Sequence, residues 1–332
     1  MTVPASSGVV DFNPAAGLRN PHLQSIVASS GVRRAALART LKPLHRATES
    51  VIIETPAGVR LAGLYTPHEQ EQGLLVLFHG WEGSARSAYL AETALLAWRA
   101  GFSVFRLNFR DHGETHHLNE GIFHSCRIDE VVDAVGEIQR RYPVRPLLLG
   151  GYSLGGNFAL RTALRAPAAG IDLHHVVAIC PAICPSNGLK AIVSAPFFYN
   201  AYFMRRWRRS LRRKGELFPQ HGIDEEMLNA DMYELTDRLV RRYTDYASAP
   251  DYFEGYSIAG ETLSPLAVPA TLLTASDDPV IPVSDFDALK LPPSARLIKL
   301  NYGGHCGFIS NWRLQSWAPR FLVQEMNRVT TP

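Results

Sequence analysis

Short apolar runs alternate with longer segments of helical pattern from about residue 50 onward, and this alternation restricts the fold more than any other feature of the chain. Residues 74–78, Leu-Leu-Val-Leu-Phe, form an unbroken apolar run, which is typical of a strand buried on both faces. Similar runs recur, and helical patterns lie between them. The sequence therefore predicts an α/β fold in which a mainly parallel central sheet is flanked by helices.

The expected elements follow from the same pattern. An antiparallel hairpin is predicted over residues 50–54 and 59–65, because the turn-forming Pro56 and Gly58 separate two short apolar stretches. The remaining predicted strands are 74–78, 103–109, 146–150, 175–180, 270–275 and 296–300. Helices are predicted over 87–100, 128–142, 158–164 and 311–328.

Between residues 185 and 262 the alternation stops, and the sequence becomes helical and rich in aromatic residues. An insertion into one large domain explains this change. The predicted organisation begins with an N-terminal extension that packs on the core (residues 1–49) and the first part of the core (50–184). A helical insertion (185–262) and the second part of the core (263–332) follow. Open α/β sheets bind ligands at the carboxyl ends of their strands, so the insertion is a candidate lid.

The segment Gly151-Tyr152-Ser153-Leu154-Gly155 is a G-x-S-x-G motif that directly follows a predicted buried strand and directly precedes a helix. Glycines stand two positions before and two positions after the serine, because the strand turns so sharply into the helix that larger side chains at those positions would collide. A serine hydroxyl is a poor nucleophile at neutral pH, and it needs a histidine base, an acid that orients the base, and donors for an oxyanion. Ser153 is therefore the candidate nucleophile.

The acid and the base are expected in two later loops. Asp278 follows the predicted strand 270–275 and is the candidate orienting acid, whereas Asp277 is expected to brace the turn. His305 follows the last predicted strand, and the glycines on both sides of it permit close backbone approach. The chain order Ser153, Asp278, His305 is the order of the triad in α/β-hydrolases.

Residues 79–84, His-Gly-Trp-Glu-Gly-Ser, follow the buried run 74–78, where such a site places its second oxyanion donor. The expected donors are the backbone amides of Trp81 and of Leu154, the residue after the nucleophile. His79 stands at a strand end and is interpreted as a structural histidine whose hydrogen bonds are satisfied. Cys306, beside the candidate base, is interpreted as a packing residue.

No metal site and no cofactor are predicted. Residues 110–117 contain three histidines and two carboxylates, but they lack the helical pair of histidines, four residues apart around a glutamate, that binds zinc. The chain has four cysteines, which are too few and too irregularly spaced for a disulfide scaffold or a zinc ribbon, and reduced thiols are expected.

Charge and hydropathy exclude other classes of protein. A formal net charge of +3 is too small an imbalance to predict a nucleic-acid partner. The first residues do not form a charged leader followed by an apolar run, and no stretch of about 18 apolar residues occurs. The sequence therefore predicts a soluble, cytoplasmic protein whose oligomeric state it does not define.

Several of these motifs together resemble the α/β-hydrolase superfamily, and within it the AB-hydrolase 4 group of YheT-like and animal abhydrolase-domain proteins. The resemblance spans nearly the whole chain and rests on residues 20–24, Asn-Pro-His-Leu-Gln, and on 79–84, 108–117, 151–157, 252–257, 277–279 and 303–308. It implies a serine hydrolase acting on carboxylic esters, with the triad on Ser153, Asp278 and His305. The Arg-Asp-His-Gly at 110–113 departs from the more usual Arg-Gly of the group.

The insertion contains an aromatic cluster followed by a basic run. The aromatic side chains are candidates for contact with an apolar acyl chain of the substrate, and the proposed contacts are Phe197, Phe198, Tyr202 and Phe203. Seven basic residues without an acid lie between Arg205 and Lys214, on a segment that is amphipathic as a helix. Two interpretations stay open: weak contact with an anionic membrane surface, or a lid helix whose arginines meet the acids at 224–226 and 231.

The function favoured by the sequence is cleavage of a medium or long acyl, lipid-like carboxylic ester through an acyl-enzyme on Ser153. A thioesterase or an acyltransferase would use the same residues. A hydrolase fold that has become a lipid- or protein-binding module is a further alternative, and loss of one of the three residues would be its mark. All three are present in this chain.

Overall fold

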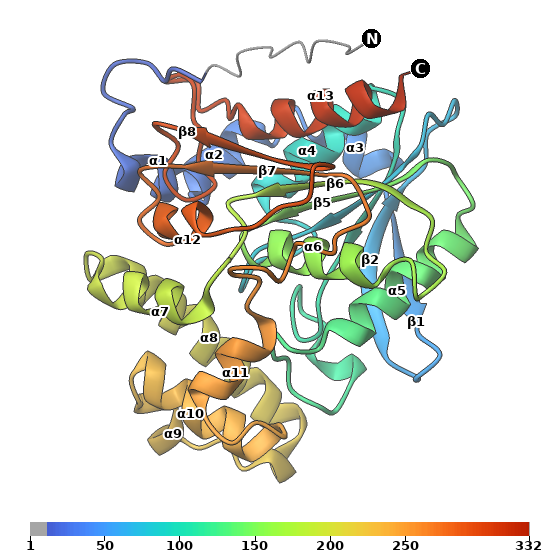
Figure 1. Cartoon of the computed structure of the whole chain (residues 1–332). Coiled ribbons are helices and arrows are strands. Elements are labelled where there is room, and N and C mark those ends of the chain that lie inside the picture. The colour runs from blue at the N-terminus through green and yellow to red at the C-terminus, as the bar shows by residue number, and fades with distance from the viewer. Residues whose placement is uncertain (1–11, 332) are drawn as a thin grey trace.

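The computed structural model describes residues 12–331, and within them eight strands form one sheet in the order β1-β2-β4-β3-β5-β6-β7-β8 (Figure 1). The strands are β1 (Glu49–Glu54), β2 (Arg60–Thr66), β3 (Leu74–Phe78), β4 (Ser103–Leu107), β5 (Leu147–Tyr152), β6 (Leu173–Ile179), β7 (Ala270–Ala275) and β8 (Ala295–Leu300). β1 and β2 form the predicted hairpin, β2 also pairs antiparallel with β4, and the other neighbours are parallel. The predicted fold class is confirmed.

Three groups of helices surround the sheet. Those that precede it are α1 (Pro21–Ala28), α2 (Gly31–Leu37) and α3 (Lys42–Ala47). Those of the core are α4 (Ala88–Arg99), α5 (Ile128–Arg141), α6 (Leu154–Arg165), α12 (Val283–Asp287) and α13 (Ala318–Thr330). Those between β6 and β7 are α7 (Pro185–Ser194), α8 (Phe198–Leu217), α9 (Glu225–Asn229), α10 (Met232–Tyr243) and α11 (Ala249–Tyr256).

Side chains of β3 alternate between two hydrophobic layers, which explains the unbroken apolar run. Leu74, Val76 and Phe78 belong to the layer that contains apolar residues of α5 and α6. Leu75 and Leu77 belong to the opposite layer, with apolar residues of α4 and α13. Because helices cover both faces of the sheet, the strand has no solvent-exposed side on which polar residues would be favoured.

The helices between β6 and β7 form a separate group at one end of the sheet, drawn at the lower left of Figure 1. They leave β6 at its carboxyl end, near the ends of β5 and β7. Within residues 12–331, no helix is long and apolar enough to cross a membrane.

Two helices begin more than one residue away from the predicted start. α6 begins at Leu154, four residues before the predicted start, because Ser153 is already its N-cap. α13 begins at Ala318 rather than at 311, because residues 311–316 form a turn instead of helix. In this turn the Asn311 side chain accepts from the Arg313 amide, and a short β-bridge joins Ile309 to Ser316. Local side-chain bonds of this kind compete with helix formation.

Candidate active site

Ser153 is the single residue between β5 and α6, and its φ of 54° and ψ of −122° are unusual for a residue with a side chain. Such a conformation persists only where the surrounding structure holds it. A Cβ on Gly151 would lie 2.2 Å from the carbonyl oxygen of Gly155, and a Cβ on Gly155 would lie 2.5 Å from that of Phe78. These distances explain why glycine is required two positions before and two positions after the serine.

The three polar residues predicted to act together form one hydrogen-bonded series. Nε2 of His305 lies 2.9 Å from Oγ of Ser153, and Nδ1 lies 2.9 Å from Oδ2 and 3.2 Å from Oδ1 of Asp278. Since Nδ1–H donates to the carboxylate, Nε2 is the ring nitrogen that accepts the serine hydroxyl. The three residues follow β5, β7 and β8, whose carboxyl ends meet at one edge of the sheet.

The two neighbouring aspartates have different contacts. The Asp278 side chain is fully buried, and its Oδ1 accepts from the amides of Val280 at 2.8 Å and Ile281 at 3.0 Å. These bonds fix the carboxylate that meets the histidine. Oδ1 of Asp277 instead accepts from the Gly304 amide at 2.8 Å. Asp277 therefore braces the loop after β8 that carries His305, here called the histidine loop, rather than the turn in which it lies, as the sequence had suggested.

The loop after β3 passes close to Ser153. A Cβ on Gly80 would lie 3.3 Å from the Cβ of Ser153, and Trp81 and Leu154 line the same small cavity as the serine. Among the described residues, neither the Trp81 amide nor the Leu154 amide has a hydrogen-bond acceptor. Both amides are therefore available to a group bound at Ser153.

Two buried histidines hold this loop. Nδ1 of His79 donates to the Gly80 carbonyl at 2.8 Å, and its Nε2 accepts from the Phe109 amide at 3.2 Å. Nε2 of His112 accepts from the Glu82 amide at 3.2 Å. Burial lowers the pKa of both histidines, to about 4 for His112, so both stay neutral at pH 7. The interpretation of His79 as a structural residue is confirmed, and His112 has the same role.

Other side chains of the histidine-rich segment 110–117 form hydrogen bonds and an ion pair with α8. Oδ1 of Asp111 accepts from Nζ of Lys214 at 2.8 Å, and its Oδ2 accepts from the Phe123 amide at 2.8 Å. The His116 ring lies 2.8 Å from the Ser210 hydroxyl. These side chains therefore bind other protein groups rather than one another.

The N-terminal extension supports the histidine loop, a role that the motif at residues 20–24 had not revealed. Gln24 is fully buried; its Nε2 donates to the carbonyls of Leu18 at 2.6 Å and Ile309 at 3.0 Å, and its Oε1 accepts from the Ile309 amide at 2.5 Å. The Ser25 hydroxyl accepts from the His305 amide at 2.8 Å. Helix α1 therefore packs against the loop that carries the histidine.

Replacing Gln24 by leucine is expected to lower the free energy of unfolding by about 2–4 kcal/mol, because it leaves three buried backbone groups without partners. Chemical denaturation followed by circular dichroism measures this change. The matched control is Ile26→Ala, a substitution at a 49 % exposed position of the same helix, which is expected to cost much less. Equal losses in the two variants would contradict the role assigned to Gln24.

Two cavities meet at Ser153. The larger has a volume of about 680 Å³ and the smaller of about 140 Å³. Phe198 and Tyr202 line the larger cavity, and Phe203 lines both. Phe197 lines neither of these two: its side chain is 83 % exposed, because it caps α8 at the outer surface. The smaller cavity is walled mainly by apolar and aromatic side chains of α7, α10 and α11, including Leu189, Ile192, Met232, Tyr252, Phe253 and Tyr256.

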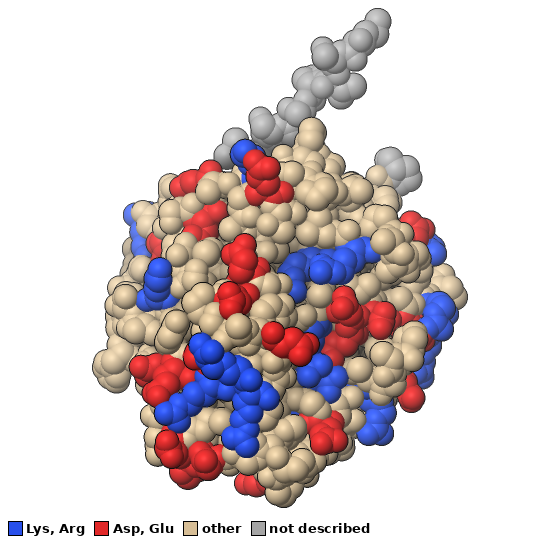
Figure 2. Space-filling model, turned by 60° about the horizontal axis from the view of Figure 1, so that its bottom comes forward, with Lys and Arg blue, Asp and Glu red and all other residues tan. Residues whose placement is uncertain are grey.

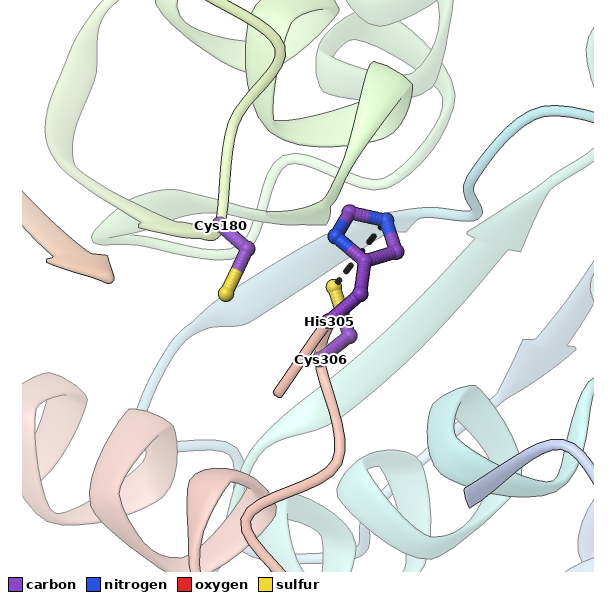
Figure 3. Close-up of side chains that lie close together, drawn as sticks. All are labelled: Cys180, His305 and Cys306. Atoms are coloured by element: carbon purple, nitrogen blue, oxygen red, sulfur yellow. Dashed lines mark hydrogen bonds between the residues drawn. The ribbon is translucent and has the colours of Figure 1, made fainter. Parts of the chain in front are cut away.

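Cys306, interpreted from the sequence as a packing residue, also contacts the candidate base His305. Its Sγ lies 4.0 Å from Nε2 of His305, and it lines the larger cavity. Burial alone would raise the pKa of this thiol, but its hydrogen bond with Cys180 and the charge of His305 lower the pKa to about 6. Figure 3 shows Cys180, His305 and Cys306 grouped at this point. One donor atom from each of the three lies within 4.8 Å of the others, but both ring nitrogens of His305 are already engaged, by Asp278 and by Ser153.

The basic run that starts at Arg205 and ends at Lys214 lies on α8 but is not uniformly exposed. The Lys214 side chain is 1 % exposed, so it is not part of any surface that could meet a membrane. Arg212 donates to both carboxylate oxygens of Glu225 at 2.8 Å, which is a contact expected for a lid helix bonded to the acids at 224–226. Figure 2, which turns the bottom of Figure 1 forward, shows a compact group of basic side chains at the lower left of this face with acidic side chains beside it.

Comparison with known proteins relates the chain to one family. A family model described as the alpha/beta hydrolase family matches residues 75–314. The putative esterase YheT of Escherichia coli is 28% identical over 94% of this chain and 91% of its own length. The monoacylglycerol lipase ABHD2 of Danio rerio is 26% identical over 59% of this chain, and the match spans 50% of that lipase.

Solved structures agree in fold. An esterase of Pyrobaculum calidifontis superposes with a TM-score of 0.54 at 18% identity, covering 94% of this chain and 97% of its own. A membrane phospholipase A described as a bacterial virulence factor superposes with a TM-score of 0.55 at 16% identity, covering 91% of this chain and 93% of its own. The resemblance seen in the sequence motifs is thus confirmed, and the chain belongs to the alpha/beta hydrolase family, in the group of YheT-like and abhydrolase-domain proteins.

Proposed function

We propose that the chain is a serine hydrolase that cleaves carboxylic esters through an acyl-enzyme on Ser153. The hydrogen-bonded series of Ser153, His305 and Asp278 is the observation that carries this proposal. His305 takes the hydroxyl proton as Oγ attacks the ester carbonyl, and then gives that proton to the leaving alcohol. The same histidine next removes a proton from water, which attacks the acyl group and releases the acid. Asp278 holds the ring and stabilises the imidazolium that forms in each step.

The backbone amides of Trp81 and Leu154 are proposed to form the oxyanion hole. Neither has an acceptor among the described residues, and both residues line the cavity at Ser153. Leu154 also begins α6, and a helix N-terminus favours the negative charge that develops on the carbonyl oxygen. Each such donor contributes about 3–4 kcal/mol to transition-state stabilisation in related chemistry.

The two cavities suggest how the two parts of an ester would be separated. The smaller, apolar cavity suits the acyl chain, and the helices that wall it belong to the segment 185–262, which we propose acts as a lid. The larger cavity suits the alcohol part, because its walls include three arginines and an acid, namely Arg34, Arg86, Arg206 and Glu82. Burial raises the pKa of Glu82 to about 7, so this carboxyl can donate as well as accept hydrogen bonds near neutral pH. A lipid-like ester with an apolar acyl chain and a polar alcohol fits this division.

Labelling with a fluorophosphonate probe tests the proposal without knowledge of the substrate. Modification of Ser153, mapped by mass spectrometry of the labelled peptide, is expected for an activated serine. A panel of nitrophenyl esters and thioesters of increasing acyl length, with and without an alcohol acceptor, then separates esterase, thioesterase and acyltransferase activities. A folded protein that neither reacts with the probe nor turns over any ester would instead be the binding module.

The pH dependence of ester cleavage follows from the surroundings of His305. Burial disfavours the charged ring, but the carboxylate of Asp278, together with Cys306, outweighs burial and raises the pKa of His305 well above the ordinary value of 6.5. Only the neutral ring can accept the serine proton, so kcat/KM is expected to fall as the pH drops through this raised pKa. The acid limb of the profile should therefore lie above pH 6.5.

Asp278→Asn is expected to move that limb to lower pH and to reduce kcat by about 10⁴-fold, because the amide removes the charge and favours the wrong tautomer. The control is Asp277→Asn, which keeps a side-chain oxygen to accept from the Gly304 amide. A profile that stays at the same pH in Asp278→Asn would exclude Asp278 as the partner of the base.

A further inference from the structure

Three arginines from separate parts of the chain line the larger cavity beside Ser153. Arg34 belongs to α2, Arg86 lies in the loop before α4, and Arg206 belongs to α8. All three residues are exposed, whereas the His305 side chain, which lines the same cavity, is only 13 % exposed. The cavity therefore extends from the proposed catalytic residues to a mouth at which the arginines lie.

These guanidinium groups lack the acidic partners that other arginines of the chain have. Within residues 12–331, none of the three forms an ion pair, whereas Arg209, on the same helix as Arg206, pairs with Glu114 at 3.7 Å. Arg206 instead donates from Nη1 to the hydroxyl of Tyr202 at 3.0 Å, and Tyr202 lines the larger cavity as well. The positive charges at the mouth are thus left for a bound group to neutralise.

The balance of charge around the cavity suits an anion. Glu82 is the single acid among the described residues that line it, so the three guanidinium groups leave an excess of two positive charges even when that carboxyl is ionised. A phosphate monoester carries a charge of about −1.5 to −2 at pH 7, which matches this excess. Guanidinium groups also bind phosphate oxygens through two parallel N–H bonds, which favours arginine at phosphate sites.

A neutral donor lies beside one of the arginines. The Ser84 hydroxyl lines the larger cavity and accepts from the Arg86 amide at 3.2 Å. Among residues 12–331 this hydroxyl has no acceptor for its own hydrogen, so it is able to donate to an oxygen of a ligand. Charged and neutral donors therefore lie together in the loop before α4.

We propose that the ester or thioester cleaved at Ser153 carries a phosphate group on its leaving part, and that Arg34, Arg86 and Arg206 bind this phosphate. This substrate class rests on the proposed function. The acyl chain occupies the smaller, apolar cavity, and the leaving part occupies the larger one, whose volume of about 680 Å³ is typical of small-molecule sites. Water cleaves the acyl-enzyme, and the products are the free acid and the phosphorylated alcohol or thiol.

Two matched pairs of substrates test the preference and identify its source. Octanoylglycerol phosphate is compared with octanoylglycerol, and octanoyl-coenzyme A with the neutral thioester octanoyl-N-acetylcysteamine. In at least one pair, kcat/KM of the phosphate-bearing substrate is expected to exceed that of its neutral partner by roughly 100-fold or more, because several charge-assisted hydrogen bonds form. The pair that shows the preference tells whether the phosphate belongs to a glycerol or to a thiol carrier. Ratios near one in both pairs would overturn the proposal.

Variants of the arginines test which groups bind the phosphate. Arg34→Gln, Arg86→Gln and Arg206→Gln should each lower the ratio of phosphate-bearing to neutral kcat/KM by roughly 10-fold, the effect of one charge-assisted hydrogen bond. The matched control is Arg209→Gln, because Arg209 lines neither cavity and pairs with Glu114; it should keep the ratio of the wild type. All four positions are exposed, and circular dichroism establishes that the variants are folded. The same ratio in the wild type and the three cavity variants would contradict the assignment.

Binding without turnover separates this proposal from the proposed function. Analogues of the same two pairs, with an ether or thioether in place of the scissile bond, are titrated into the whole chain by calorimetry, and the phosphate-bearing analogue is expected to bind roughly 100-fold more tightly in the pair that shows the preference. Such binding in a protein that hydrolyses no ester would show that the proposed hydrolysis, and not the phosphate site, is wrong. Hydrolysis of esters together with equal binding within each pair of analogues would leave the hydrolase standing and overturn the phosphate site.

Discussion

Ser153→Ala is expected to abolish fluorophosphonate labelling and to lower kcat for an ester substrate by about 10⁶-fold, because no acyl-enzyme can form without the hydroxyl. The remaining catalysis would come from binding and from the amides of Trp81 and Leu154, which the substitution leaves in place. Gel fluorescence and steady-state kinetics on the same preparations measure the two effects.

The substitution also tests which group His305 activates. Ser264→Ala removes an exposed hydroxyl far from the cavity and is expected to label as the wild type does. Circular dichroism of Ser153→Ala should be unchanged, since the side chain makes one hydrogen bond, to His305. Labelling that persists in Ser153→Ala, with the modified peptide located elsewhere, would refute Ser153 as the nucleophile.

Lys214→Met is expected to lower the free energy of unfolding by about 3–5 kcal/mol, the largest stability effect predicted for this chain. Lys214 and Asp111 are 1 % and 5 % exposed, and they form an ion pair at 2.8 Å. The ammonium also donates to the carbonyls of His116 and Asn119. Its removal leaves the buried Asp111 carboxylate without a countercharge and two carbonyls without this donor, and it removes one of the contacts between α8 and the core. Chemical denaturation measures the loss, and limited proteolysis shows whether α8 opens first.

The neighbouring residue provides the control. Arg213 pairs with Glu216 at 3.2 Å, but its side chain is 53% exposed, so Arg213→Met is expected to change stability by less than about 0.5 kcal/mol. Asp111→Asn added to Lys214→Met removes the stranded charge and keeps an acceptor for the Phe123 amide, so the double variant should recover part of the loss. Similar stability of Lys214→Met and Arg213→Met would contradict the role of the buried pair.

Features that depend on neighbouring residues could be predicted. The strands at 74–78 and 270–275 were recognisable because their runs are apolar throughout, and the structure places them at the same residues. The turn at Ser153 was recognisable because small residues on both sides are required there. The start of α13 was predicted wrongly, because the Asn311 turn competes with helix over a segment whose periodicity favours a helix.

Contacts between residues far apart in the chain were not predictable in the same way. Lys214 occupies a position in a basic helix that suggests exposure, and only Asp111, 103 residues earlier, explains its burial. Gln24 belongs to the motif at residues 20–24, and the sequence alone did not show what this side chain does. In the structure it bonds to the backbone of Ile309, 285 residues later, and so supports the histidine loop. Phe197 and Phe203 looked equivalent as aromatic residues of one segment, yet only Phe203 lines the cavities.

The sequence by itself determined the order along the chain of the strands and of the core helices α4, α5, α6 and α13, the sharp turn at Ser153 and the loops that carry Asp278 and His305. Periodicity and turn formation depend on residues a few positions apart, so they could be recognised without the fold. The tertiary structure decided which buried charges find partners, which aromatic side chains face a cavity, and that Cys180 and Cys306 meet beside the histidine. These outcomes depend on desolvation and on contacts between distant segments, which arise only when the chain is folded.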